Sequence, residues 1–165
     1  TEEEKNAVVI NPGAGLPSRR WPVERFIEII DYLIKKKCYN IILSGSINEK
    51  IIGDIIAKEF PGKINNLSGK TSLMKIAGII SKSKLLITND TGILHIGAAL
   101  NAPMIAIMGP GDFIRYDPGV ISANARVLYN GMNCSPCEKY DCKDLKCLKS
   151  ISVEEVKKAI DEFIN

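Results

Sequence analysis

The single histidine of this chain lies in a stretch whose residue types suit the binding of a phosphate. Residues 85–100 read LLITNDTGILHIGAAL, an apolar run that ends at Asn-Asp-Thr-Gly before a second apolar stretch carries His95. Asp90 or Thr91 can cap a helix that begins here, and Gly92 lets a ligand approach the positive end of the helix dipole. His95 follows Gly92 by three residues, so its imidazole shares the side of the helix that holds the cap. The stretch predicts an anion site.

A structural role explains the same residues. A single histidine on an apolar helix commonly packs in the core and bonds to a backbone carbonyl, and Asp-Thr-Gly after a strand commonly caps the next helix without binding a ligand. On pattern alone, the sequence slightly favours this structural role for His95.

A cysteine cluster could bind metal. Cys134, Cys137, Cys142 and Cys147 form C-x2-C-x4-C-x4-C in a polar segment, and Cys38 stands apart from them. Four thiolates can hold zinc tetrahedrally, and the first pair has the spacing of a zinc knuckle, but no second C-x2-C follows. In a cytosolic chain, disulfides are less common than bound metal or reduced thiols, although oxidation after purification can pair cysteines. Structural zinc, a disulfide and free thiols stay open, and redox catalysis has little support.

Glycine and polar residues also gather at other expected strand ends. The loops read NPGAG (11–15), SGSINE (44–49), LSGKTS (67–72) and MGPGD (108–112). None matches G-x-G-x-x-G or G-x-x-x-x-G-K-[ST], so neither the dinucleotide fingerprint nor the P-loop is present. LSGKTS contains a lysine and a threonine but lacks the glycine spacing of a P-loop.

Composition narrows the class of protein. The chain has 165 residues, of which 45% are hydrophobic, and this is enough for one domain with its own core. The charged fraction is 25% and the formal net charge is +3, which is too small to indicate a nucleic-acid surface. No apolar run reaches the roughly 18 residues of a membrane span, and the acidic start TEEEK is unlike a signal peptide. These observations predict a cytoplasmic protein that binds no nucleic acid.

Apolar runs rich in strand-forming residues alternate with segments of helical period. The expected strands are 7–10, 40–45, 64–69, 84–88, 103–109 and 125–129. Helices are expected from Pro22 onward, over about 48–60, 71–81 and 91–100, and finally over 152–164, where Ser152 and Glu155 form a capping box. The apolar face of the first helix consists of Phe26, Ile29, Ile30, Leu33 and Ile34.

Six strands separated by helices predict an α/β fold, a doubly wound and mostly parallel Rossmann-like sheet with helices on both faces. Parallel neighbours need a crossover connection, which is usually a helix. In such sheets ligands bind beyond the carboxyl ends of the strands, near the point where the strand order reverses. We therefore expect the polar loops to lie together at one edge of the sheet.

In order along the chain, these loops resemble those of glycosyltransferase family 9, the lipopolysaccharide heptosyltransferases. The similarity runs from about Val8 to Val156 through NPGAG, SRRWP, SGS, LSGKTSL, TNDTGILHIGAAL, APMIAIMGP and CSPC. Its most specific marks are D-[ST]-G-x-x-H and the preceding PG…[KR]xWP loop. The resemblance implies that residues 1–165 are a single Rossmann-like domain, the C-terminal, donor-binding half of a GT-B glycosyltransferase. The N-terminal acceptor domain would then be absent from this chain.

The resemblance also implies a nucleotide-sugar donor, ADP-heptose or a similar ADP-sugar. Its diphosphate would contact Thr91, Gly92 and His95, with Arg19 at the position where the family usually has a lysine. Asp90 would orient this segment or contact the sugar. The other implied donor-binding residues are Gly13 in the first loop, Ser46, Asn48 or Glu49 near the ribose, and Leu67, Ser68 and Gly69 around the adenine and ribose.

Each implied contact also has a structural explanation. Arg19 and Arg20 could be solvated charges, Leu67 a core residue and Glu49 the start of a helix. Trp21 precedes a helix-opening proline and is expected to pack in the core. The resembling family has similar cysteines in the same region, which implies that the cluster ties down a loop.

The implied reaction is glycosyl transfer with inversion, from the ADP-sugar to a lipopolysaccharide core or another envelope glycan. A carboxylate deprotonates the acceptor hydroxyl, while positive groups and a helix dipole stabilise the departing diphosphate without a required cofactor or metal. In the resembling enzymes this base belongs to the N-terminal domain, so no catalytic residue is assigned and the isolated domain should be inactive. The implied partners are the donor, a glycan or lipid-linked acceptor and the N-terminal domain, at the inner face of the cytoplasmic membrane.

Two functions of other classes remain alternatives. A non-catalytic adenine-nucleotide or dinucleotide-binding Rossmann domain with a structural cysteine cluster would share the fold, although NPGAGLPS lacks the glycine fingerprint. A scaffold held by a cysteine-bound metal would use the cysteine segment as its functional surface. Bound metal without nucleotide affinity would favour the scaffold.

Overall fold

Six parallel strands form one sheet with the order β3-β2-β1-β4-β5-β6. The computed structural model describes residues 6–37, 39–137 and 139–164. The strands are β1 (Ala7–Asn11), β2 (Asn40–Leu43), β3 (Ile64–Asn66), β4 (Leu85–Asn89), β5 (Met104–Met108) and β6 (Ala125–Tyr129). Every pair of neighbours is parallel, and the order reverses between β1 and β4. The predicted doubly wound α/β fold is confirmed.

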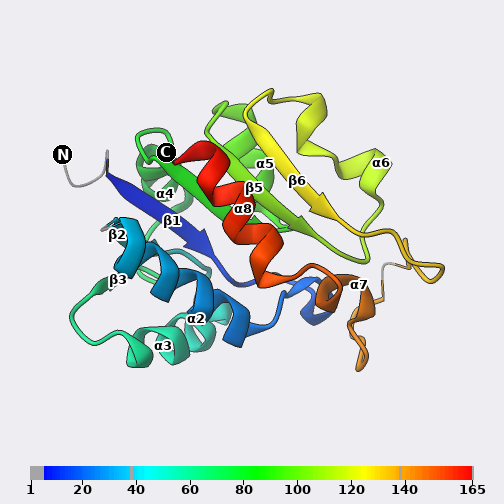
Figure 1. Cartoon of the computed structure of the whole chain (residues 1–165), viewed down its shortest axis with the longest axis horizontal. Helices are drawn as coiled ribbons and strands as arrows, with labels where there is room; N and C mark the ends of the chain where they lie inside the picture. The colour runs from blue at the N-terminus through cyan, green and yellow to red at the C-terminus, as the bar shows by residue number, and fades with distance from the viewer. Residues whose placement is uncertain (1–5, 38, 138, 165) are drawn as a thin grey trace.

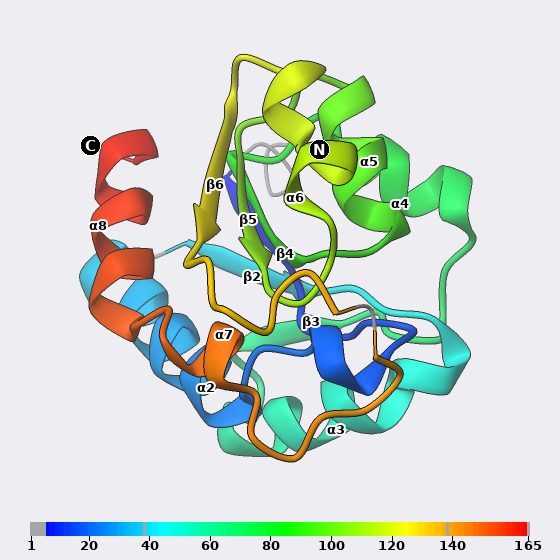
Figure 2. The ribbon, with the colours of Figure 1, turned by 90° about the vertical axis from the view of Figure 1, so that its right-hand side faces the viewer.

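Helices cover both faces of this sheet (Figure 1). One layer consists of α2 (Val23–Tyr32), α3 (Lys50–Glu59), α7 (Lys146–Lys149) and α8 (Val153–Phe163). The other layer contains α4 (Leu73–Ile80) and α5 (Gly92–Ala99). Figure 2 shows α2 and α8 on one side of the sheet and α4 and α5 on the other. The short elements are η1 (Pro17–Arg19), the π-helix η2 (Leu33–Lys37), η3 (Ile47–Glu49), α6 (Phe113–Tyr116) and η4 (Pro118–Val120).

Strand β1 divides the core into two halves. Val8 and Ile10 pack in the cluster that contains α2, α3 and α8, whereas Ala7 and Val9 pack in the cluster that contains α4 and α5. Successive side chains of a strand point to opposite faces, and all four of these residues are fully buried. A strand that is apolar at every position is therefore what a sheet covered on both faces requires.

The carboxyl ends of β1, β2 and β4 lie at the same level. The register pairs Ile10 with Leu43 in β2 and Asn11 with Thr88 in β4. The arrowheads in Figure 1 point to one side of the molecule, and Figure 2 views that side. The loops after these three strands consequently meet at one edge, as the parallel sheet predicted.

Most expected elements agree with the structure to within a few residues. The capping box is present, since the Ser152 backbone N–H donates to Glu155 Oε2 at 2.7 Å and the Glu155 N–H donates to Ser152 Oγ at 3.2 Å. Elements α6, α7 and η4 were not expected, because segments of three or four residues are too short to show a period. Cys38 and the start TEEEK lie outside the described residues. Across the described ranges, no helix combines the length and apolar character of a membrane span.

Candidate functional site

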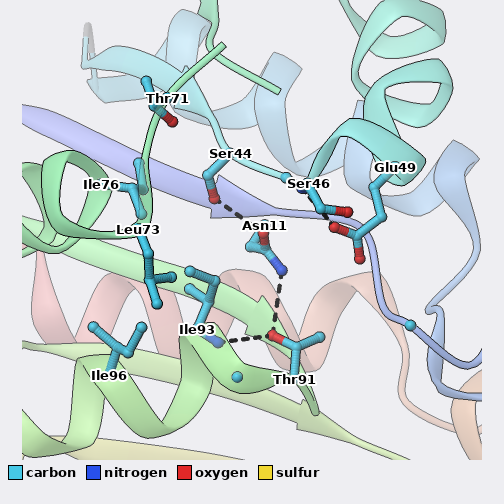
Figure 3. A pocket seen from close by; sticks show the side chains of 13 residues that line it. Asn11, Ser44, Ser46, Glu49, Thr71, Leu73, Ile76, Thr91, Ile93 and Ile96 are labelled. Atoms are coloured by element: carbon cyan, nitrogen blue, oxygen red, sulfur yellow. Dashed lines mark hydrogen bonds between the residues drawn. The ribbon is translucent and has the colours of Figure 1, made fainter. Parts of the chain in front are cut away.

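A pocket of about 580 Å³ opens at the carboxyl ends of β1, β2 and β4 (Figure 3). One part is polar and is lined by Asn11, Ser44, Ser46, Glu49 and Thr91. The other part is aliphatic and is lined by Leu73, Ile76, Ile93 and Ile96. An apolar wall beside a few convergent polar groups is typical of a small-molecule site.

Hydrogen bonds connect three strand ends in the polar part of the pocket. The Ser44 hydroxyl donates to Asn11 Oδ1 at 3.0 Å, and Asn11 Nδ2 donates to Thr91 Oγ1 at 3.4 Å. Thr91 Oγ1 also accepts the Ile93 backbone N–H at 3.2 Å, so Thr91 is the N-cap of α5. Of the two residues predicted to cap this helix, Thr91 does so.

Glu49 and Gly13 meet at the edge of the pocket. Glu49 Oε2 accepts the Ser46 backbone N–H at 2.7 Å, which closes a capping box around η3. A Cβ at Gly13 would lie 2.6 Å from Glu49 Oε1, so only glycine leaves room for this carboxylate. Glu49 therefore stands at the start of α3, as expected, and also lines the pocket, while its contact with a ribose stays a prediction. Asn48 is exposed and does not line it.

Arg19 and Asp90 form an ion pair beside the N-terminus of α5. Arg19 Nη1 lies 3.0 Å from Asp90 Oδ2, and the two side chains are 17% and 2% exposed. The guanidinium also lies over the ring of Tyr116, at 5.7 Å from its centroid. Gly111 packs against the pair, since a Cβ there would lie 2.4 Å from Asp90 Oδ2. Arg19 is therefore a positioned cation and not a solvated charge.

His95 lies on the side of α5 that faces α6. Its imidazole is half-buried, with its centroid 6.2 Å from that of Tyr116. Ile93 and Ile96 line the pocket, and a residue between them on the helix faces away from it. Within the part of the chain that the structure describes, His95 has no hydrogen bond to a backbone carbonyl, so that structural role is not observed. His95, Arg19 and Tyr116 instead form a group on the far side of the α5 N-terminus, which we call the cationic group.

The loop after β3 is placed differently from the expectation. Leu67 packs with the α4 and α5 side of the core. Ser68 is 1% exposed and lies against Gly53, where an added Cβ would be 2.4 Å from its Oγ. Gly69 has a φ of +71° and turns the chain. These three residues were expected around adenine and ribose, but the pocket is lined from this loop by Thr71.

Sequence reasoning missed several residues of the site. Asn11 and Ser44 had a visible signal, because each is the first polar residue after a buried apolar strand. Thr71 and Leu73 follow the Gly69 turn, whose direction the sequence did not reveal. Tyr116 had no signal, since it lies in the short helix α6 and reaches Arg19 only through tertiary structure.

The core packing predicted for Trp21 is confirmed. Trp21 is fully buried, its Nε1 donates to the Ile151 carbonyl at 3.0 Å, and its ring meets Phe26 edge to face. Arg20 is half-buried and donates from Nε to the Ala14 carbonyl at 2.9 Å, so it is not a freely solvated charge. Trp21 therefore anchors the end of the loop that carries Arg19.

The cysteine segment does not gather its thiols into a metal site. Cys134, Cys137, Cys142 and Cys147 are all free, from exposed Cys134 to buried Cys147. No three histidine, cysteine, aspartate or glutamate side chains of the described residues are grouped so that they could hold a metal ion. Burial raises the pKa of the Cys147 thiol, and the nearby Cys134 and Cys137 raise it further. Within the described residues, these four cysteines therefore form no disulfide with one another.

The cysteine segment nevertheless lies against the site loops. The Ser18 backbone N–H donates to the Tyr140 carbonyl at 3.2 Å, and its hydroxyl donates to the Lys139 carbonyl. The Cys137 N–H donates to the Pro110 carbonyl at 3.0 Å. The segment thus connects the loop after β1 with the loop after β5.

Comparisons with known proteins agree with the fold and the loops. The sequence profile of glycosyltransferase family 9 (heptosyltransferase) matches residues 1–148. Lipooligosaccharide heptosyltransferase 2 of Campylobacter jejuni serotype O:2 is 30% identical over 157 residues, which cover 92% of this chain and 49% of that protein. Lipopolysaccharide heptosyltransferase 2 of Escherichia coli K12 is 35% identical over 112 residues, which cover 65% of this chain and 32% of that protein.

Solved structures of heptosyltransferases also share the fold of this chain. The E. coli ADP-heptose lps heptosyltransferase II has a TM-score of 0.81 and 27% identity, over 98% of this chain and 47% of that one. An E. coli heptosyltransferase solved with ADP has a TM-score of 0.77 and 25% identity, over 98% of this chain and 45% of that one. The chain spans about half the length of these relatives.

Proposed function

Because the chain belongs to glycosyltransferase family 9, the heptosyltransferases, we propose that it binds the nucleotide-sugar donor of such an enzyme. The observation that carries this proposal is the position of the α5 N-terminus, between the pocket and the cationic group. The backbone N–H groups and the positive dipole end of a helix favour a phosphate there. Two E. coli relatives are described with ADP or ADP-heptose, which supports an ADP-sugar as the ligand.

The proposed ligand crosses the first turn of α5. Its ribose lies beside Glu49 and Ser46, where a carboxylate can accept hydrogen bonds from ribose hydroxyls. Its base lies against the aliphatic wall of Leu73, Ile76, Ile93 and Ile96. Its diphosphate lies at Thr91 and Gly92, within the field of the cationic group. Among the described residues, Arg19 Nε is buried without a hydrogen-bond partner, and a phosphate oxygen could accept from it.

In the proposed reaction an acceptor hydroxyl oxygen bonds to the anomeric carbon with inversion, as the bond from that carbon to the diphosphate breaks. Arg19, His95 and the α5 dipole stabilise the charge on the departing ADP. The hydroxyl proton passes to a carboxylate of an N-terminal acceptor domain, which we propose the whole enzyme has. The acceptor is a lipopolysaccharide-core or lipid-linked glycan at the inner face of the cytoplasmic membrane, and no cofactor is proposed.

A calorimetric titration tests donor binding. The chain is titrated with ADP, ADP-heptose, UDP and NAD without added metal, and the ADP species should bind most tightly. Thr91→Ala and His95→Ala should each weaken ADP binding by about three- to tenfold, the effect of losing one hydrogen bond or charged contact. Ser81→Ala at the C-terminal cap of α4 is the control.

Two results would contradict the proposal. If ADP bound no tighter than UDP and NAD, a general nucleotide pocket would replace the ADP-sugar site. If both variants bound ADP normally but lost stability, Thr91 and His95 would have structural roles only.

A further inference from the structure

Asn89 is the last residue of β4 and lies directly before the Asp-Thr-Gly segment. Its side chain is 0% exposed, and it does not line the pocket. An asparagine amide has two N–H donors and one carbonyl acceptor, and burying any of them without a partner costs about 1 to 3 kcal/mol. The partners of this buried amide therefore indicate what the residue does.

The amide bonds to the backbone at both ends of loop 12–21. Asn89 Nδ2 donates to the Pro12 carbonyl at 2.9 Å and to the Gly13 carbonyl at 3.2 Å. Asn89 Oδ1 accepts the Trp21 backbone N–H at 3.2 Å. A single side chain thus fixes the start of the loop relative to its end.

Loop 12–21 carries Arg19, and Arg19 pairs with the residue that follows Asn89. Asn89 holds the backbone of the loop, while Asp90 holds the guanidinium at 3.0 Å. Asn89 ends β4 and Asp90 follows it before α5, so the strand end that leads into α5 also determines where Arg19 lies relative to the helix N-terminus.

We propose that Asn89 is a positioning residue for the diphosphate end of the bound nucleotide and that it acts through Arg19. This inference rests on the proposed function, because it requires a phosphate near Arg19. Without the Asn89 amide, both ends of loop 12–21 lose their common anchor and the guanidinium moves relative to α5. Loop 12–21 contributes Gly15 to the pocket lining, whereas the aliphatic wall for the base comes from α4 and α5, so nucleoside binding should change less than binding of the diphosphate.

The test compares ADP with adenosine, which lacks both phosphates. Calorimetry on Asn89→Ala should show ADP binding weakened by about tenfold, the size expected when a charge-assisted contact is misaligned, with adenosine binding changed less than about twofold. Asn89→Ser is measured alongside it, because its hydroxyl is smaller than the amide but can accept the Trp21 N–H. In an Arg19→Ala background, Asn89→Ala should have no further effect on ADP binding.

Asn66→Ala is the matched control. Asn66 also ends a strand, and its amide bonds to Asp54 Oδ1 and to the Ser68 N–H, both at 3.0 Å, but not to loop 12–21. It should leave the ratio of ADP affinity to adenosine affinity unchanged.

Three outcomes would overturn the inference. The first is an equal loss of ADP and adenosine affinity in both Asn89 variants. The second is a loss of ADP affinity on Asn89→Ala that persists in the Arg19→Ala background. The third is a loss of ADP affinity on Asn66→Ala as large as that on Asn89→Ala. If the wild-type chain binds ADP and Asn89→Ala binds it equally well, only this inference fails. If the wild-type chain binds no ADP, the proposed function fails and this inference fails with it.

Discussion

Loop 12–21 and the cysteine segment, residues 130–137 and 139–147, both cross the carboxyl edge of the sheet, but they are held differently (Figure 2). The buried side-chain amide of Asn89 bonds to both ends of loop 12–21, and the last residue of the loop, Trp21, is fully buried. The cysteine segment keeps Cys134 and Tyr140 exposed and reaches Ser18 through backbone carbonyls. In the sequence, residue types alone marked both segments as candidate sites. Of the two, loop 12–21 has the buried anchors, and it holds the side chain of Arg19 at a defined position. Suitable residue types are therefore not sufficient for a site, because buried partners must also hold the functional side chain in place.

The largest expected effect removes the anchor at the exit of loop 12–21. Trp21→Ala should lower the free energy of unfolding by about 4 kcal/mol, because removing this fully buried ring leaves a large cavity. Urea denaturation measures this change. Tyr140→Ala in the cysteine segment should cost less than about 0.5 kcal/mol, since that side chain is 68% exposed. Equal losses would mean that the two segments are anchored equally.

The next effect concerns the ion pair. Arg19→Ala should lower the free energy of unfolding by about 2 to 3 kcal/mol, because the carboxylate of Asp90, 2% exposed, loses its cation. Adding Asp90→Asn should recover part of this loss, which a double-mutant cycle in urea would detect. Lys139→Ala, an exposed charge of the cysteine segment, is the control. A fully additive double variant would show that the pair does not contribute to stability.

Thiol reactivity should separate the two ends of the cysteine segment. Burial raises the pKa of the Cys147 thiol, so at pH 8 less of it is the reactive thiolate, and burial also limits the access of a reagent. Iodoacetamide should therefore alkylate buried Cys147 more slowly than exposed Cys134 in the folded chain. Raising the pH through the pKa of Cys147 should narrow the difference between the two alkylation rates. Peptide mass mapping follows the alkylation of both cysteines. Equal rates in the folded chain would show that Cys147 is not protected.

The smallest expected effect is that of a chelator. With free thiols, dialysis against EDTA should shift Tm by less than about 1 °C, whereas losing 1 kcal/mol of bound-metal stabilisation would already shift it by about 2 to 4 °C. Differential scanning calorimetry before and after dialysis makes the comparison. A drop in Tm of several degrees that added zinc reverses would show that a bound metal anchors the cysteine segment as firmly as loop 12–21 is anchored.

The sequence predicted the sheet because burial on both faces makes each central strand apolar throughout, as in Ala7 to Ile10. It predicted a cap at Asp90 or Thr91 because capping depends on local chemistry, and Thr91 is the cap. The family resemblance implied that Leu67, Ser68 and Gly69 surround adenine and ribose, and nothing in the local sequence showed that Thr71 lines the pocket from this loop. Asn89 and Tyr116 escaped notice for a related reason, since Asn89 bonds to residues 68 to 77 positions away along the chain and Tyr116 itself lies on an unexpected helix. The assignment of individual residues to a donor stays a prediction.

Four successive residues at the end of β4 each face a different partner. Asn89 faces loop 12–21, Asp90 faces Arg19, Thr91 caps α5 and bonds to Asn11, and Gly92 opens onto the pocket. A substitution disturbs one of these relations at a time. An inserted or deleted residue would shift every side chain after it onto another's partner. The length of this segment is therefore under a stronger constraint than its composition, and genetic changes that alter length should be tolerated there least.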